Sequence, residues 1–142
     1  MGACFGTEAR ISDQNIEAVR RTYEVFVARH EPPWELFTDD ATMDATEASP
    51  DVLVIRSRAE ATAALRSYAD TFERYNVVLD EIIHADDTRV VTTVRDGGRI
   101  KGSDTELWNR FFHVFTFRDG KIAWWSTHTE HGSALRAAGL GK

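Results

Sequence analysis

The chain has 142 residues, a hydrophobic fraction of 42% and a formal net charge of −6, so it is long enough for one domain with a substantial core. Its basic residues are scattered, which argues against a nucleic-acid or anionic-membrane surface. No apolar stretch approaches the roughly 20 residues that a membrane span needs, and we expect no secretion signal. With Cys4 as the single cysteine, no intrachain disulfide can form, so we expect a cytoplasmic protein.

The first half of the sequence predicts mainly helices. Residues 1–11 are expected to be a flexible tail. Ser12 is a suitable N-cap for a helix that starts near Asp13 and ends near His30, before the Pro32-Pro33 pair. The next elements in chain order are a short helical turn at 34–37, a short strand at 41–46, a loop at 47–57 and a second helix at 58–72.

The second half predicts strands. They are expected at 76–84, at 89–95 and in a long aromatic hairpin at 104–128 that turns at Asp119-Gly120, with a bend at 96–98 and a last short helix at 129–138. Helices followed by a strand meander indicate a single α+β domain at 12–139. We expect a cone-shaped, curved antiparallel or mixed sheet with about three helices on its concave side. The mouth of such a cone is a natural pocket for a small molecule.

Strand alternation sorts the hairpin into two faces. We assign the concave side to the face that carries Asn109, Phe111, His113 and Phe115 on the first strand and Trp125, Thr127 and Thr129 on the second. A register slip of one residue would invert this assignment. Phe112, Val114 and Trp124 would then be convex, and because an exposed apolar patch is costly, a homodimer partner is expected to cover them.

Three passages resemble a known family: RRTYEVFV in the first helix, FTDDATMDAT at the first strand and RFFHVFTFRDGKIAWW in the hairpin. They are similar to the SnoaL-like polyketide cyclase and ketosteroid-isomerase group of the nuclear transport factor 2-like superfamily, over roughly residues 13–132. The resemblance implies a cystatin-like or nuclear-transport-factor-2-like cone. That superfamily contains isomerases, cyclases, epoxide hydrolases and non-catalytic binding domains, so the fold alone indicates little about the reaction.

The resemblance implies a catalytic set of His113, Tyr23 and Asp44. Tyr23 matches the oxyanion-hole tyrosine of ketosteroid isomerases, and His113 matches the aspartic acid that completes that hole. The base of those isomerases aligns with Ala45, and Asp44 lies one residue away, so the acid–base set is not intact. An imidazole suits acid or base catalysis near neutral pH, and Glu47 is an alternative second carboxylate.

We expect a hydrophobic small-molecule ligand whose binding residues are Asn109, Phe111, Phe115, Trp125, Thr127, Thr129, Trp34 and Phe72, although the aromatic ones would serve equally as core. No metal site is predicted, because His128 and His131 have no identifiable third ligand, and no motif calls for a cofactor.

The leading hypothesis is a cofactor-independent enzyme that moves protons beside a carbonyl of a hydrophobic, oxygenated molecule, in a cyclisation, isomerisation or dehydration. The alternative is a non-catalytic binding or dimerisation domain, which the alanine at position 45 favours. An epoxide hydrolase is a third alternative, and against it Arg110 is expected on the face opposite His113.

Overall fold

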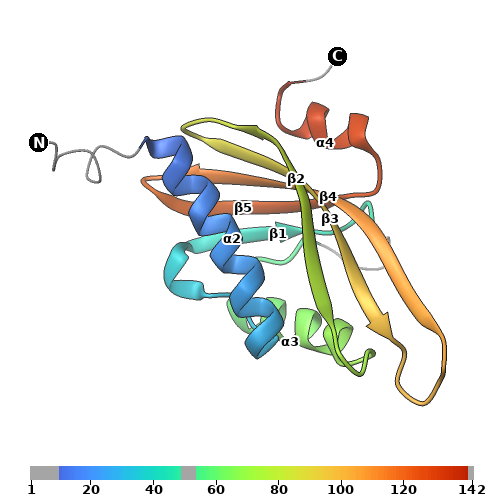
Figure 1. Ribbon diagram of the computed structural model, residues 1–142. Coiled ribbons are helices and arrows are strands. Elements are labelled where there is room, and N and C mark those ends of the chain that lie inside the picture. The colour runs from blue at the N-terminus through green and yellow to red at the C-terminus, as the bar shows by residue number, and fades with distance from the viewer. Residues whose placement is uncertain (1–9, 49–53, 141–142) are drawn as a thin grey trace, which may run out of the picture.

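The computed structural model describes residues 10–48 and 54–140 (Figure 1). Its elements are α2 (Ile11–Arg29), the 3₁₀ turn η1 (Trp34–Leu36), β1 (Phe37–Asp44), α3 (Arg58–Ala69), β2 (Asn76–Ala85), β3 (Arg89–Arg99), β4 (Glu106–Arg118), β5 (Lys121–His128) and α4 (His131–Ala137). The strands form one sheet in the order β1-β5-β4-β3-β2, in which β1 runs parallel to β5 and the other pairs are antiparallel. This confirms the predicted α+β class and the mixed sheet.

The N-terminal boundary of α2 differs from the prediction. The predicted tail lies outside the described residues except for its last two positions, and the helix already begins at Ile11. Arg10 is the N-cap and makes no side-chain capping bond, so Ser12 is inside the helix and is not its cap. Among the described residues, no helix combines the length and apolar character needed to cross a membrane.

The main core lies between one face of the sheet and helices α2 and α3. Val19 and Tyr23 of α2 pack there against Phe115 and Trp125 of the hairpin. Figure 1 shows α2 running across this concave face, with α3 near its lower end. Because burying one large apolar side chain stabilises a fold by about 1.5–3 kcal/mol, this layer holds the sheet and both helices together.

The C-terminal helix α4 packs on the opposite, convex face of the sheet. Ala134 and Ala138 contact Val91 and Val114, and Val114 is only 1% exposed. Phe112 packs beside the ring of His131 at 5.5 Å. The chain therefore covers part of the apolar face that we had assigned to a partner. Dimerisation through the rest of that face stays a prediction.

A bulge changes the alternation of the aromatic hairpin near its turn. Thr116 pairs with Trp124 and Phe117 pairs with Ile122, so Ala123 is an extra residue without an opposite partner. The bulge moves Ile122 to the concave face, where it is fully buried in the main core with Phe117. Simple alternation had placed Ile122 on the other face.

Strand β3 continues through Gly97 and Gly98, where the sequence predicted a bend. Gly97 has φ 146°, and a Cβ there would lie 1.9 Å from the carbonyl oxygen of Leu107 on β4. Glycine is therefore required for the two strands to approach this closely. As a result, Asp96 is part of β3, paired with Asn109 of β4, and points to the concave side.

Candidate active site

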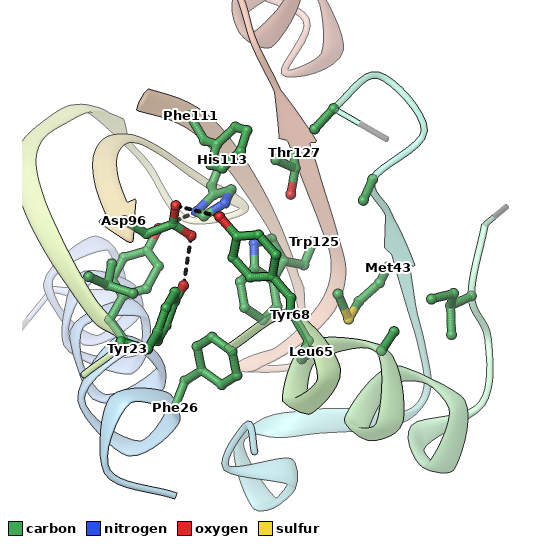
Figure 2. Close-up of a pocket in the computed structure, with 16 residues that line it drawn as sticks. Tyr23, Phe26, Met43, Leu65, Tyr68, Asp96, Phe111, His113, Trp125 and Thr127 are labelled. Carbon is green, nitrogen blue, oxygen red and sulfur yellow. Dashed lines mark hydrogen bonds between the residues drawn. The ribbon is translucent and has the colours of Figure 1, made fainter. Parts of the chain in front are cut away.

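A cavity of about 150 Å³ lies between the concave face of the sheet and helices α2 and α3 (Figure 2). Its lining residues are Tyr23, Phe26, Met43, Ala45, Ala48, Ile55, Ala64, Leu65, Tyr68, Tyr75, Val77, Asp96, Phe111, His113, Trp125 and Thr127. A cavity of this size in another protein encloses a benzene molecule. The wall is mostly apolar, with a few polar groups that converge on one space, as in small-molecule sites.

The first polar group in the wall is a hydrogen-bonded chain of three side chains. The hydroxyl of Tyr23 lies 2.7 Å from Nδ1 of His113 and 2.8 Å from Oγ1 of Thr92. The fold creates this chain because Thr92 and His113 are opposite each other in the β3–β4 ladder, and Tyr23 approaches them from α2. All three side chains are buried.

Burial determines the protonation of this chain. Burial, together with a smaller effect of the charge of His128, lowers the pKa of His113 to about 3. Burial also raises the pKa of Tyr23. At neutral pH the imidazole is therefore uncharged, with one nitrogen as donor and the other as acceptor, and the phenol keeps its proton. The Tyr23–His113 pair is therefore uncharged before a ligand binds, and it can form hydrogen bonds with the ligand or transfer a proton to or from it.

The second polar group is centred on Asp96. Its Oδ1 accepts a hydrogen bond of 2.9 Å from the hydroxyl of Tyr68, and its Oδ2 accepts one of 2.7 Å from the hydroxyl of Tyr75. The amide of Asn109 donates in turn to the Tyr68 hydroxyl, at 3.1 Å. Burial raises the pKa of Asp96, and the two phenol hydrogen bonds oppose that change.

Trp125 forms the aromatic wall beside His113. Its ring stands edge-on to the imidazole at 5.5 Å and stacks on Phe115 at 5.1 Å. Within the described part of the chain, its buried Nε1 has no hydrogen-bond partner, although buried indole N–H groups usually have one. The wall therefore holds an unpaired donor.

The structure brings several residues named from the sequence together around the cavity. His113 and Tyr23 line it, as do Phe111, Trp125 and Thr127. Asn109 does not line it and instead supports Tyr68. Phe115 is fully buried behind Trp125 and His113, so it belongs to the core.

Other named residues lie elsewhere. Asp44 pairs with Ser126 of β5, and Ser126 pairs with Val114 of β4, whose side chain lies on the convex face. The Oδ1 atom of Asp44 accepts hydrogen bonds from the backbone N–H and the hydroxyl of Thr46. Its carboxylate therefore stabilises a turn and does not line the cavity.

Thr129, Trp34 and Phe72 are also absent from the cavity wall. Thr129 donates hydrogen bonds to the carboxylate of Glu47, and the indole N–H of Trp34 donates one to the hydroxyl of Thr62. Phe72 packs in a second hydrophobic cluster, with Phe26, Ala69 and Tyr75. Aromatic character alone did not distinguish these positions from the true wall.

Asp96, Tyr68 and Tyr75 line the cavity but were not predicted as site residues. Tyr68 was assigned only to the inner face of its helix, and Asp96 was assigned to a bend. One signal was available: alternation carried past Val94 would have placed Asp96 on the same face. Among residues 10–48 and 54–140, no group of three or more His, Cys, Asp or Glu side chains is placed to hold a metal ion.

These features define a protein of the nuclear-transport-factor-2-like fold class, an α+β cone with a small-molecule-sized cavity. The chain belongs to the SnoaL-like domain family, whose model matches residues 19–125. No curated protein matches it.

Several solved structures share this fold. Bal32a, from a soil-derived mobile gene cassette, is 23% identical, with 89% of this chain and 96% of that chain covered and a TM-score of 0.72. TerC, co-crystallised with polyporic acid, is 20% identical, with 89% of this chain and 97% of that chain covered and a TM-score of 0.69. An LEH-like epoxide hydrolase of M. tuberculosis is 19% identical, with 94% of this chain and 89% of that chain covered and a TM-score of 0.65. At these identities the likeness concerns the fold.

Proposed function

We propose that this protein is a cofactor-independent enzyme that transfers a proton beside a carbonyl group of a hydrophobic, oxygenated small molecule. The observation that carries the proposal is the hydrogen bond between Tyr23 and His113 in the wall of an apolar cavity. An ordinary core would fill this space with apolar side chains. Here two groups that can donate, accept and exchange protons border a pocket with a mostly apolar wall.

The expected chemistry is enolate formation followed by reprotonation, which is the common step of isomerisation, cyclisation and dehydration. A proton leaves the carbon next to the carbonyl, and negative charge develops on the carbonyl oxygen. One proton of the Tyr23–His113 pair is used in their own hydrogen bond, so the pair offers one donor to such an oxygen. That donor is Nε2–H of the imidazole in one tautomer and O–H of the phenol in the other, and it stabilises the oxygen in an apolar surrounding. A ligand oxygen would also offer an acceptor to Nε1 of Trp125, for which residues 10–48 and 54–140 supply no hydrogen-bond partner.

The size of the cavity restricts the reacting part of the substrate. About 150 Å³ encloses one ring, so a steroid-like or polyketide-like molecule would place only its reacting ring inside. The co-crystal of TerC with polyporic acid shows that one protein of this fold was studied with an organic ligand, which supports a small-molecule substrate here.

The alternative is a non-catalytic binding domain with the same cavity. The observation that favours it is Ala45, which lines the cavity at the position where the resemblance places a catalytic base. Under this alternative, ligands occupy the cavity and leave it unchanged.

The test is the conversion of 3-cyclohexen-1-one to its conjugated isomer, followed by ultraviolet absorbance, together with deuterium uptake by cyclohexanone in D₂O. We expect wild-type turnover and a loss of about 10²-fold or more in His113→Phe. His84→Asn is the matched control, because His84 bonds Asp86 outside the cavity. Near-normal turnover by a folded His113→Phe variant would contradict the proposal. Ring binding with no turnover by the wild type would favour the binding domain.

A further inference from the structure

Asp96 is unusual among the acidic residues of this chain. Within residues 10–48 and 54–140, it is the one aspartate or glutamate in the buried class, with 6% of its surface exposed. No cation forms an ion pair with it in the described part of the chain. A buried carboxylate without a counter-ion is costly, and such groups are concentrated at functional sites.

The hydrogen bonds around Asp96 orient its carboxylate but leave some of its acceptor positions unoccupied. Tyr68 and Tyr75 each donate to a different oxygen, whereas a carboxylate has about four acceptor positions. Figure 2 shows Asp96 directed toward the same space as Tyr68 and His113, and all three line the cavity. An acceptor position therefore remains for a proton taken from a ligand.

The position of Asp96 relative to His113 suits a one-ring ligand. Asp96 is opposite Asn109 in the β3–β4 ladder and His113 is four residues further along β4, a backbone separation of about 13 Å. Both side chains line the cavity. One ring can thus meet the carboxylate on one side and the Tyr23–His113 pair on the other.

We infer that Asp96 is the general base of the proposed reaction and supplies the carboxylate that the sequence had assigned to Asp44. The inference rests on the proposed function. The carboxylate takes a proton from the carbon beside the ligand carbonyl, and the C–H electron pair moves to the carbonyl oxygen, which is held at the Tyr23–His113 end. The protonated Asp96 then returns the same proton to the γ carbon, so the ring isomerises with no net gain or loss of atoms.

A purely structural role for Asp96 makes a different prediction. A carboxylate that only orients Tyr68 and Tyr75 is needed for folding, and its ionisation would not determine the rate. A catalytic base must be ionised, so kcat/KM falls on the acid side of its pKa. Burial raises the pKa of Asp96, and the tyrosine hydrogen bonds oppose that rise. Removing one of these bonds therefore raises the pKa further and moves the fall in kcat/KM, the acid limb of the profile, to higher pH.

The experiment measures kcat/KM for 3-cyclohexen-1-one from pH 4 to 9 in wild type, Asp96→Asn, Tyr68→Phe and the control Asp80→Asn. Asp80 is an exposed carboxylate paired with Arg95. We expect a loss of about 10²-fold or more in Asp96→Asn, an acid limb at higher pH in Tyr68→Phe, and no change in the control. Thermal unfolding of each variant reports whether it is folded.

The outcomes separate this inference from the proposed function. Turnover within threefold of wild type in Asp96→Asn, combined with the loss in His113→Phe, overturns the role of Asp96 and leaves the proposed function standing. An unchanged acid limb in Tyr68→Phe also overturns it, even if Asp96→Asn does not fold. Absence of turnover by the wild type contradicts both.

Discussion

The hydroxyl of Tyr23 lies 2.7 Å from Nδ1 of His113, although 90 residues separate them in the sequence. One residue belongs to α2 and the other to β4, so the bond connects the helical layer to the sheet at the wall of the cavity. It joins two of the side chains that the sequence analysis proposed as catalytic.

Replacing Tyr23 with Phe removes this hydrogen bond and leaves a buried imidazole nitrogen without its partner. An unsatisfied buried group costs about 1–3 kcal/mol, so we expect the free energy of unfolding in urea to fall by that amount. The double variant with Thr92→Val measures the coupling, since Thr92 bonds the same hydroxyl. Strictly additive effects of the two changes would contradict a shared network.

The pH dependence of stability has opposite signs at His113 and Asp96. The pKa of His113 is lowered from 6.5 to about 3 on folding, so below about pH 6.5 the unfolded chain binds a proton that the folded chain does not. Its contribution makes the free energy of unfolding fall as the pH drops from 6.5 toward 3. The pKa of Asp96 is raised, so its contribution is greatest below the ordinary value of 3.8 and is lost as the pH rises through the folded pKa.

Urea unfolding of wild type, His113→Phe and Asp96→Asn at several pH values measures how the free energy of unfolding changes with pH in each protein. One proton of difference between states gives a slope of about 1.4 kcal/mol per pH unit. Between pH 4 and 6, stability should decline less on acidification in His113→Phe than in wild type. It should decline more in Asp96→Asn. Parallel curves for all three proteins would show that neither group titrates differently on folding.

Gly97→Ala is expected to destabilise the fold strongly. The new Cβ would lie 1.9 Å from the Leu107 carbonyl oxygen at a φ of 146°, which disrupts the β3–β4 ladder next to Asp96. Gly102→Ala is the control, because Gly102 also has positive φ but no atom lies within 4 Å of the added methyl group. We expect Gly97→Ala to cost at least about 2 kcal/mol more than Gly102→Ala. Equal thermal stability of the two variants would contradict the close approach.

Glu47 connects the segment after β1 to the end of β5. Its carboxylate accepts from the backbone and hydroxyl of Thr129 and lies 3.1 Å from Nδ1 of His128. Ala45 and Ala48, on either side of it, line the cavity. Glu47→Ala should therefore lower stability by about 1 kcal/mol and weaken phenol binding several-fold in calorimetry. The exposed Glu81→Ala is the control, and phenol affinity equal to wild type in Glu47→Ala would contradict this positioning role.

Much of this architecture could be predicted from local patterns. The aromatic run and the Asp119-Gly120 turn predicted β4 and β5, and alternation placed His113 on the concave face correctly. The errors came from non-local geometry. The bulge at Ala123 moved Ile122, and the close contact between Gly97 and Leu107 turned a predicted bend into strand, which is why Asp96 was missed. Asp44 was named through the resemblance, whereas strand pairing directs it to the other face.

The most direct test of a functional cavity at His113 is an NMR titration of protein labelled with ¹⁵N in its histidine rings. Phenol, which carries a ring and a hydroxyl like the enol of a one-ring ketone, is added at pH 7. We predict a saturable shift of the His113 ring nitrogens and no change at His84, which bonds Asp86 outside the cavity. If the His113 signals do not move with up to about 10 mM phenol, or move only in parallel with those of His84, the central claim is wrong.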